Sequence, residues 1–170
     1  LCPPFPPVPA AVALLTLFAL DAVRYPILVV LGPSLSGKTE WAKTLFKKPH
    51  ELKIGWLEQF PDAMRRFSKK INDGLILDDV RDLEFVVRHQ DKLQGKYDHR
   101  AEFGTTPGGT CAFSRDMFAT PVVVTINYTT KNLHYLETND FLGNTGNRTV
   151  VTFPLSVAPP VTRAVLPVVQ

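Results

Sequence analysis

The first residues with a spacing suited to chemistry are GPSLSGKT, a glycine and four further residues followed by Gly37-Lys38-Thr39. Loops of this pattern cradle nucleotide phosphates with backbone N–H groups. In this interpretation Lys38 bridges the β- and γ-phosphates of ATP, and the Thr39 hydroxyl binds Mg²⁺. The residues expected to contact the nucleotide are Gly32, Pro33, Ser34, Leu35, Ser36, Gly37, Lys38 and Thr39.

Two neighbouring carboxylates, Asp78 and Asp79, follow the apolar residues of the run GLILDDV. A site for a metal–nucleotide complex requires a carboxylate near the phosphate-binding loop. One acid can hold the Mg²⁺ shell, and the other can orient or deprotonate the attacking water. We assign Asp78 to the ion and Asp79 to the water, since neighbours on a strand point in different directions. The alternative, an N-cap for the next helix, suits Asp82 better.

A third polar residue, Asn127, ends the apolar run VVVTIN. An amide at this point can sense the γ-phosphate or position a water molecule. Asparagine at the end of a strand is also a common turn residue. Asn127 therefore becomes a catalytic candidate only together with Lys38 and the two aspartates.

Alternating apolar runs and amphipathic segments must position these side chains. We expect strands at 25–31, 52–57, 74–80, 120–127 and 148–153, and helices at 38–48, 62–71 and 82–93. Strands separated by helices indicate a three-layer α/β domain with a largely parallel sheet. Ligands of such domains collect at the carboxyl ends of the strands.

The long, turn-rich segment 94–119 separates the second and third core strands. We expect a projecting hairpin there. Basic and aromatic side chains on a hairpin suit single-strand binding through phosphates and stacking. The alternative is a solvated loop over the edge of the core. The side chains concerned are Lys92, Lys96, Tyr97, Arg100, Phe103 and Phe113.

Composition restricts the remaining classes. With 170 residues and 45% apolar content, the chain is long enough for one domain with a sizeable core. A net charge of +3 gives no global electrostatic reason to expect nucleic-acid binding. Cys2 and Cys111 lie far apart and have no metal or redox spacing, which favours a reduced, intracellular protein.

The two ends differ from the middle, and we divide the chain at 24 and 153. Residues 1–24 are proline-rich and then apolar, and we expect them outside the core; a cleaved or anchoring segment is the alternative. The apolar run is too short to span a bilayer comfortably and lacks a basic flank, so no membrane association is expected. Residues 154–170 form a proline-broken, irregular tail.

The core, residues 25–153, resembles the superfamily 3 helicase domain. The nearest likeness is to the replication-associated (Rep) proteins of circular single-stranded DNA viruses, such as circoviruses and geminiviruses. That family carries Walker A, Walker B, B′ and an Asn-terminated motif C in the order found here. The specific part of the resemblance follows Walker B, where YDHRAEF leads into Gly108-Gly109-Thr110, then Phe113 and the Asn-terminated strand.

The resemblance implies a modified AAA+ core that assembles as a ring, a hexamer. It implies ATP-driven unwinding and translocation on single-stranded DNA, in preference to RNA, during replication. ATP and Mg²⁺ are the implied cofactors, and the nucleus rather than the cytoplasm is the implied location. The family's subunit-bridging arginine corresponds to Arg148, for which a surface arginine at a strand start is the alternative.

The chain departs from the family pattern at several points. Pro107 stands where relatives commonly place a lysine before the glycine pair, so Lys96, His99 or Arg100 must substitute in nucleic-acid binding. The His-hydrophobe-His and nicking-tyrosine motifs of the endonuclease domain do not precede the glycine-rich loop. The unusual termini add the possibility of a viral gene captured in a cellular genome, with lost or altered function.

Three other classes remain open at this point. The RNA helicases of positive-strand RNA viruses share most of these motifs. Small-molecule kinases also pair a P-loop with a short α/β domain. A decayed nucleotide-binding remnant would act by interaction alone. DNA-stimulated ATP turnover separates the helicase from the kinase and from the remnant.

Overall fold

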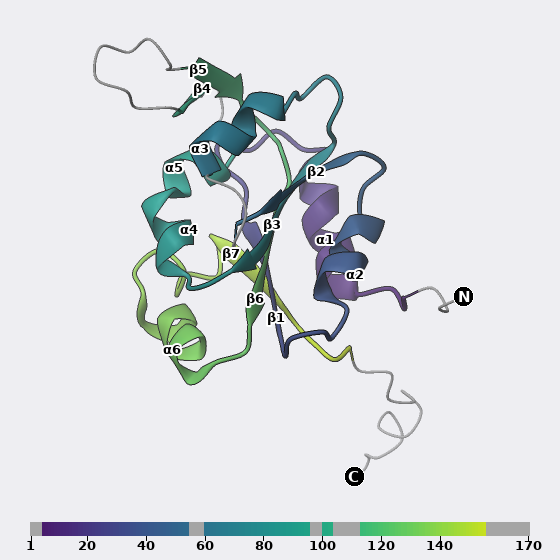
Figure 1. Ribbon diagram of the computed structural model, residues 1–170, viewed down its shortest axis with the longest axis vertical. Coiled ribbons are helices and arrows are strands. Elements are labelled where there is room, and N and C mark those ends of the chain that lie inside the picture. Colours follow the sequence, from purple (N-terminus) through teal and green to yellow (C-terminus); the bar gives the residue numbers. More distant parts are fainter. Residues whose placement is uncertain (1–4, 55–59, 96–99, 104–112, 156–170) are drawn as a thin grey trace.

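The computed structural model describes residues 5–54, 60–95, 100–103 and 113–155, which form a central sheet with helices on both faces (Figure 1). Its five strands pair in parallel throughout, in the order β2–β3–β6–β1–β7. The expected three-layer α/β domain with a parallel sheet is confirmed. The strands are β1 (Ile27–Gly32), β2 (Pro49–Lys53), β3 (Gly74–Val80), β6 (Val122–Asn127) and β7 (Arg148–Thr152).

The central strands are apolar on both faces because both faces are covered. All six residues of β1 are buried. Leu28 and Val30 pack on one side of the sheet, whereas Ile27 and Val29 pack on the other. Because side chains alternate along a strand, one continuous apolar run supplies residues to two separate layers of the core.

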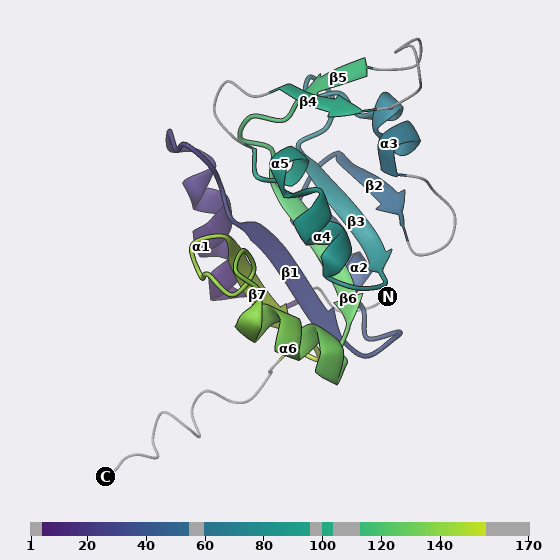
Figure 2. The same cartoon turned by 90° about the vertical axis from the view of Figure 1, so that its left-hand side faces the viewer.

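The helices divide between these two layers (Figures 1 and 2). One layer holds α1 (Pro9–Leu17) and α2 (Lys38–Thr44). The other layer holds α3 (Phe60–Ala63), the 3₁₀ helix η1 (Met64–Arg66), α4 (Glu84–Arg88), α5 (Gln90–Leu93) and α6 (Thr130–Thr138).

Helix α1 corrects the expectation that residues 1–24 lie outside the core. Its Ala11 and Leu14 are only 1% and 3% exposed, and they pack in the cluster that contains Leu28 and Val30. The seven-residue α2 is short for covering a whole sheet face, and α1 covers the part next to β7. Of the expected irregular tail, residues 156–170 lie outside the described residues.

Several element bounds also differ from expectation. Strand β2 begins before the expected 52–57. The expected helix 62–71 ends at Arg66, because the backbone of the next residue, Phe67, is extended with ψ 133°. Helix α6 was not expected; it begins after Thr129, whose Oγ accepts a hydrogen bond from the Asn132 N–H at 3.2 Å.

The expected hairpin is present as a separate pair of antiparallel strands, β4 (Arg100–Phe103) and β5 (Phe113–Asp116), at one end of the molecule (Figure 2). Residues 104–112, which join the two strands, lie outside the described part. Phe103 is 2% exposed and stacks on Phe113, so it packs in the core and cannot stack on a base. Within the described ranges, no helix is long and apolar enough to cross a membrane.

Candidate functional site

A cleft of about 420 Å³ opens where β1, β3 and β6 end. Ligand sites of parallel sheets lie at these carboxyl ends. The structure therefore brings together the three motifs that the sequence separates by long stretches of chain. The lining consists of residues 34–40 of the glycine-rich loop and its helix, together with Asp78, Asp79, Thr125 and Asn127.

The loop from Gly32 to Thr39 has two positions that require glycine. A Cβ on Gly32 would lie 2.6 Å from Cβ of Phe153, closer than real Cβ contacts occur. Gly37 has φ 90°, a left-handed conformation that favours glycine, and it directly precedes α2. The Ser36 hydroxyl donates to the Pro33 carbonyl at 2.8 Å and closes the loop on itself. Leu35, with φ 60°, is fully exposed on the loop.

Lys38 turns its ammonium into the loop. Nζ donates to the carbonyl oxygens of Gly32 at 2.9 Å and Pro33 at 2.6 Å, and it lies 3.4 Å from Oδ1 of Asn127. Burial lowers the pKa of Lys38, and the charges of Asp79 and Asp78 oppose that shift. A cation held at the cleft by neutral carbonyls can exchange them for phosphate oxygens, with which hydrogen bonds are stronger.

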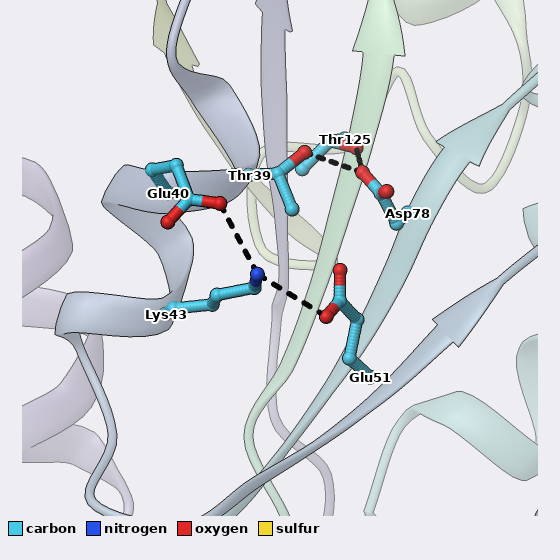
Figure 3. A network of polar contacts seen from close by, with 6 residues as sticks. All are labelled: Thr39, Glu40, Lys43, Glu51, Asp78 and Thr125. Atoms are coloured by element: carbon cyan, nitrogen blue, oxygen red, sulfur yellow. Dashed lines mark hydrogen bonds and ion pairs between the residues drawn. The ribbon is translucent and has the colours of Figure 1, made fainter.

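A hydroxyl network joins the loop to Asp78 (Figure 3) and, through Thr125, to Asp79. Thr39 Oγ1 donates to Oδ1 of Asp78 at 2.5 Å, and Thr125 Oγ1 donates to the same oxygen at 2.9 Å. The Asp79 N–H donates to Thr125 Oγ1 at 2.9 Å. Thr125 thus holds both aspartates from the neighbouring strand. Sequence reasoning gave Thr125 no role, although it is the one hydroxyl side chain in the run VVVTIN.

A β-bulge turns both carboxylates toward one cleft. Leu77 lies opposite Val124 and Val80 lies opposite Ile126, so β3 has one residue more than β6 in this interval. Asp79 takes φ 55°, which aspartate tolerates better than most residues. Regular pleating would send the two neighbouring side chains to opposite faces. Bulges of this kind commonly re-aim side chains beside functional sites.

Asn127 lies where β6 meets α6. Its side-chain oxygen faces Lys38, and its backbone carbonyl accepts a hydrogen bond from Nδ2 of Asn132 at 3.0 Å. Asn132 is 2% exposed, and sequence reasoning did not single it out. The start of α6 therefore fixes the strand end that presents the Asn127 amide to the cleft.

The donor set fits Mg²⁺. This ion prefers oxygen ligands, keeps several waters and usually binds one or two carboxylates together with substrate phosphates. Thr39 Oγ1 and Asp78 Oδ1, which lie in contact, are such oxygen ligands. In the described part of the chain no group of three His, Cys, Asp or Glu side chains could hold a metal ion by itself. Thr39 and Asp78 supply two oxygen ligands of the kind that Mg²⁺ prefers.

Arg148 and Arg100, two of the remaining predicted site residues, lie away from this cleft. Arg148 begins β7 opposite Ile27, at the other end of β1 from Gly32, and its Nε donates to the Leu142 carbonyl at 3.0 Å. Arg100 begins β4, where its Nε donates to Oγ of Ser114 at 3.2 Å. Lys96 and His99 lie outside the described residues.

Neither the comparison with protein-family models nor that with curated protein sequences gives a match. Fold and cleft define the class of protein: a three-layer α/β domain with a five-stranded parallel sheet and a polar cleft at its carboxyl edge. The chemistry available at this site is that of the side chains in the cleft.

Proposed function

We propose that the chain is a P-loop ATPase that binds Mg²⁺-ATP in the cleft and hydrolyses it. The observation that carries the proposal is the convergence of Lys38, Thr39 and Asp78 from two separate strand ends. Phosphoryl transfer needs positioning and electrostatic stabilisation more than covalent chemistry from the protein. A lysine, a hydroxyl and a carboxylate at the mouth of a glycine-rich loop meet that need.

Each side chain has one task in this proposal. The loop backbone wraps the phosphates, and Lys38 exchanges its carbonyl partners for phosphate oxygens. Thr39 and Asp78 hold Mg²⁺, which neutralises phosphate charge when bound. Asp79 orients or deprotonates the attacking water, and Asn127, beside Lys38, contacts the γ-phosphate or that water.

The position of β6 supports hydrolysis rather than transfer to a small acceptor. This strand lies between β1, which leads into the loop, and β3, which carries the aspartates. Asn127 therefore enters the cleft between the lysine and the carboxylates, where a water attacking the γ-phosphate must be held. An amide and a carboxylate on neighbouring strands suit this positioning of water.

We further propose that the ATPase is a superfamily 3-like, AAA+-type helicase domain acting on single-stranded DNA in replication. The order of the motifs along the chain and the hairpin between the second and third of them support this assignment. Assembly as a hexameric ring and a nuclear location belong to the same proposal. Single-stranded DNA should then stimulate ATP turnover, which neither a small-molecule kinase nor an inactive remnant would show.

The test of the ATPase is Lys38→Ala. Charge-assisted hydrogen bonds contribute about 1.5–3 kcal/mol each, so loss of the ammonium should reduce turnover to background. Lys43→Ala is the matched control on the same helix, because Lys43 faces Glu40 at 3.1 Å and Glu51 at 3.4 Å instead of the aspartates (Figure 3). Phosphate release is measured for both variants, with circular dichroism to verify folding.

Lys38→Met, which keeps the aliphatic stem, guards against a folding defect caused by the alanine. Wild-type turnover in a folded Lys38 variant would contradict the proposed mechanism. Equal losses in the Lys38 and Lys43 variants would also contradict it, because the loss would then not come from the cleft.

A further inference from the structure

A second, strongly basic groove of about 450 Å³ lies between the loop after η1 and the β4–β5 hairpin. Among the described residues that line it, the single acidic side chain is Asp116, whose carboxylate lies 3.9 Å from Nζ of Lys69. The whole chain, by contrast, carries 19 basic and 16 acidic residues, so positive charge is concentrated here. The cationic side chains that line the groove are Arg65, Arg66, Lys69, Lys70, Arg100 and Arg115.

Arg115 fixes the groove by joining its two walls. Its guanidinium donates to the carbonyls of Phe67 at 3.1 Å, Arg65 at 2.7 Å and Ser114 at 2.8 Å. The loop after η1 is therefore attached to β5 through backbone acceptors. This arrangement holds the two walls in place before a ligand binds, so less conformational entropy is lost on binding.

The aromatic ring of β5 that adjoins the groove is already covered by cations. The Phe113 ring already carries the guanidinium groups of Arg65 at 4.4 Å and Arg115 at 4.6 Å, and it stacks on Phe103. A base has no open aromatic face at Phe113 to stack on. Cationic contacts without base stacking follow the backbone of a nucleic acid and are independent of its sequence.

The groove is separate from the nucleotide cleft. Its two walls directly precede the amino ends of β3 and β6, whereas the cleft lies at the carboxyl ends of the same strands. A seven-residue strand spans about 20 Å. A ligand in the groove therefore leaves the cleft accessible to ATP.

We propose that this groove binds the phosphate backbone of single-stranded nucleic acid. The inference rests on the proposed function, because a strand-translocating ATPase needs a strand-binding surface outside its ATP site. The groove is lined by cations from both walls, which can contact the phosphates of one strand. The proposal assigns strand contacts to Arg65, Arg66, Lys69 and Lys70, which precede β3, together with Arg100 of the hairpin.

The test compares two double variants that each remove two exposed cations. Lys70→Ala/Arg100→Ala removes charge from the groove, and Lys131→Ala/Arg88→Ala removes the same charge from α6 and α4, outside the groove. Lys131 and Arg88 are 69% and 64% exposed, so both variants should fold. Binding of labelled oligo(dT) is followed by fluorescence anisotropy without nucleotide, between about 50 and 200 mM salt.

The groove variant should bind at least about tenfold more weakly, and its log–log salt slope should fall by about 0.7 per lost phosphate contact. The control pair should keep wild-type affinity. Equal affinities of the groove and control variants would overturn the proposal. So would equally tight binding of a duplex, or of poly-glutamate, since the groove would then serve a different polyanion.

Oligo(dT) binding by Lys38→Ala separates this inference from the proposed function. That variant should bind oligo(dT) like the wild type, because Lys38 lies in the other cleft. Lost turnover with retained strand binding supports both proposals. Strand binding that fails only in the groove variant supports the groove even if the chain proves to have no ATPase activity.

Discussion

Asp78 and Asp79 are neighbours in sequence with different surroundings. Asp78 is half-buried and accepts hydrogen bonds from Thr39 and Thr125, whereas Asp79 is exposed at the bulge. The first setting suits a fixed metal ligand, and the second leaves a carboxylate facing the solvent side of the cleft. The two residues should therefore differ in the step that their loss affects.

Asp79→Asn should retain Mg²⁺-ATP and slow hydrolysis about 100-fold or more, the usual contribution of a general base. Asp78→Asn should instead weaken Mg²⁺-dependent ATP binding. Equilibrium titration with a fluorescent ATP analogue and single-turnover hydrolysis separate these effects. If Asp79→Asn loses Mg²⁺-ATP affinity while Asp78→Asn keeps it, the two roles are reversed.

His89 makes stability depend on pH. Burial lowers its pKa, and the charges of Lys92 and Arg88 lower it further, against a hydrogen bond to the Phe85 carbonyl. Its ring packs against Phe60 with centroids 4.9 Å apart. Below the unfolded pKa of about 6.5 the unfolded chain takes up a proton that the folded chain resists, so the contribution of His89 to folding stability falls as pH decreases.

His89→Gln should therefore show a smaller loss of unfolding free energy between about pH 7 and pH 5 than the wild type. Urea unfolding at both pH values measures this difference, which is independent of the packing lost with the ring. His134→Gln, at an exposed position of α6, is the control. Identical pH dependence in wild type and His89→Gln would rule His89 out as the source.

At the scale of elements, α1 completes the sheet face that α2 leaves open. Leu14→Ala should cost about 2–5 kcal/mol of unfolding free energy, as for other buried leucines. Val12→Ala, at a residue 55% exposed on the same helix, should change stability by less than about 0.5 kcal/mol. Denaturant unfolding measures both variants. Equal effects of the two would show that α1 does not belong to the core.

At the scale of the whole molecule, Arg148 lies too far from the cleft to act in its own subunit, so in the proposed ring it would act on a neighbouring one. It begins β7 opposite Ile27, five residues before Gly32, which is about 16 Å along the strand. An arginine supplied by a neighbouring subunit increases the rate of phosphoryl transfer about 10³–10⁵-fold in other systems. Turnover per subunit should therefore rise with protein concentration and with single-stranded DNA.

Arg148→Ala should abolish that rise, and mixing it with Lys38→Ala should restore part of the activity, since each variant supplies the half that the other lacks. Steady-state ATPase assays over a concentration series measure this, with Arg88→Ala as the control for an exposed arginine. Constant turnover per subunit, together with wild-type activity of Arg148→Ala, would exclude the ring mechanism.

The sequence by itself determined the class of fold and most of the residues that line the cleft at the carboxyl ends of the strands. GPSLSGKT, the acid pair and Asn127 each follow a buried apolar run, and those runs form the parallel strands β1, β3 and β6. The apolar pattern of the strands and the residue spacing of the loop are local signals, because each depends on residues that are close together in the chain. The carboxyl ends of parallel strands then converge without further information.

Only the tertiary structure decided what depends on contacts between distant segments. Thr125 acquired its role because β6 lies beside β3, and the bulge that turns both aspartates into the cleft is a mismatch between those two strands. Helix α1 packs in the core because the short helix α2 leaves part of the same sheet face uncovered. The basic groove exists because Arg115 hydrogen-bonds a loop fifty residues earlier in the chain. Pairings of this kind depend on long-range packing, which spacing along a sequence does not encode.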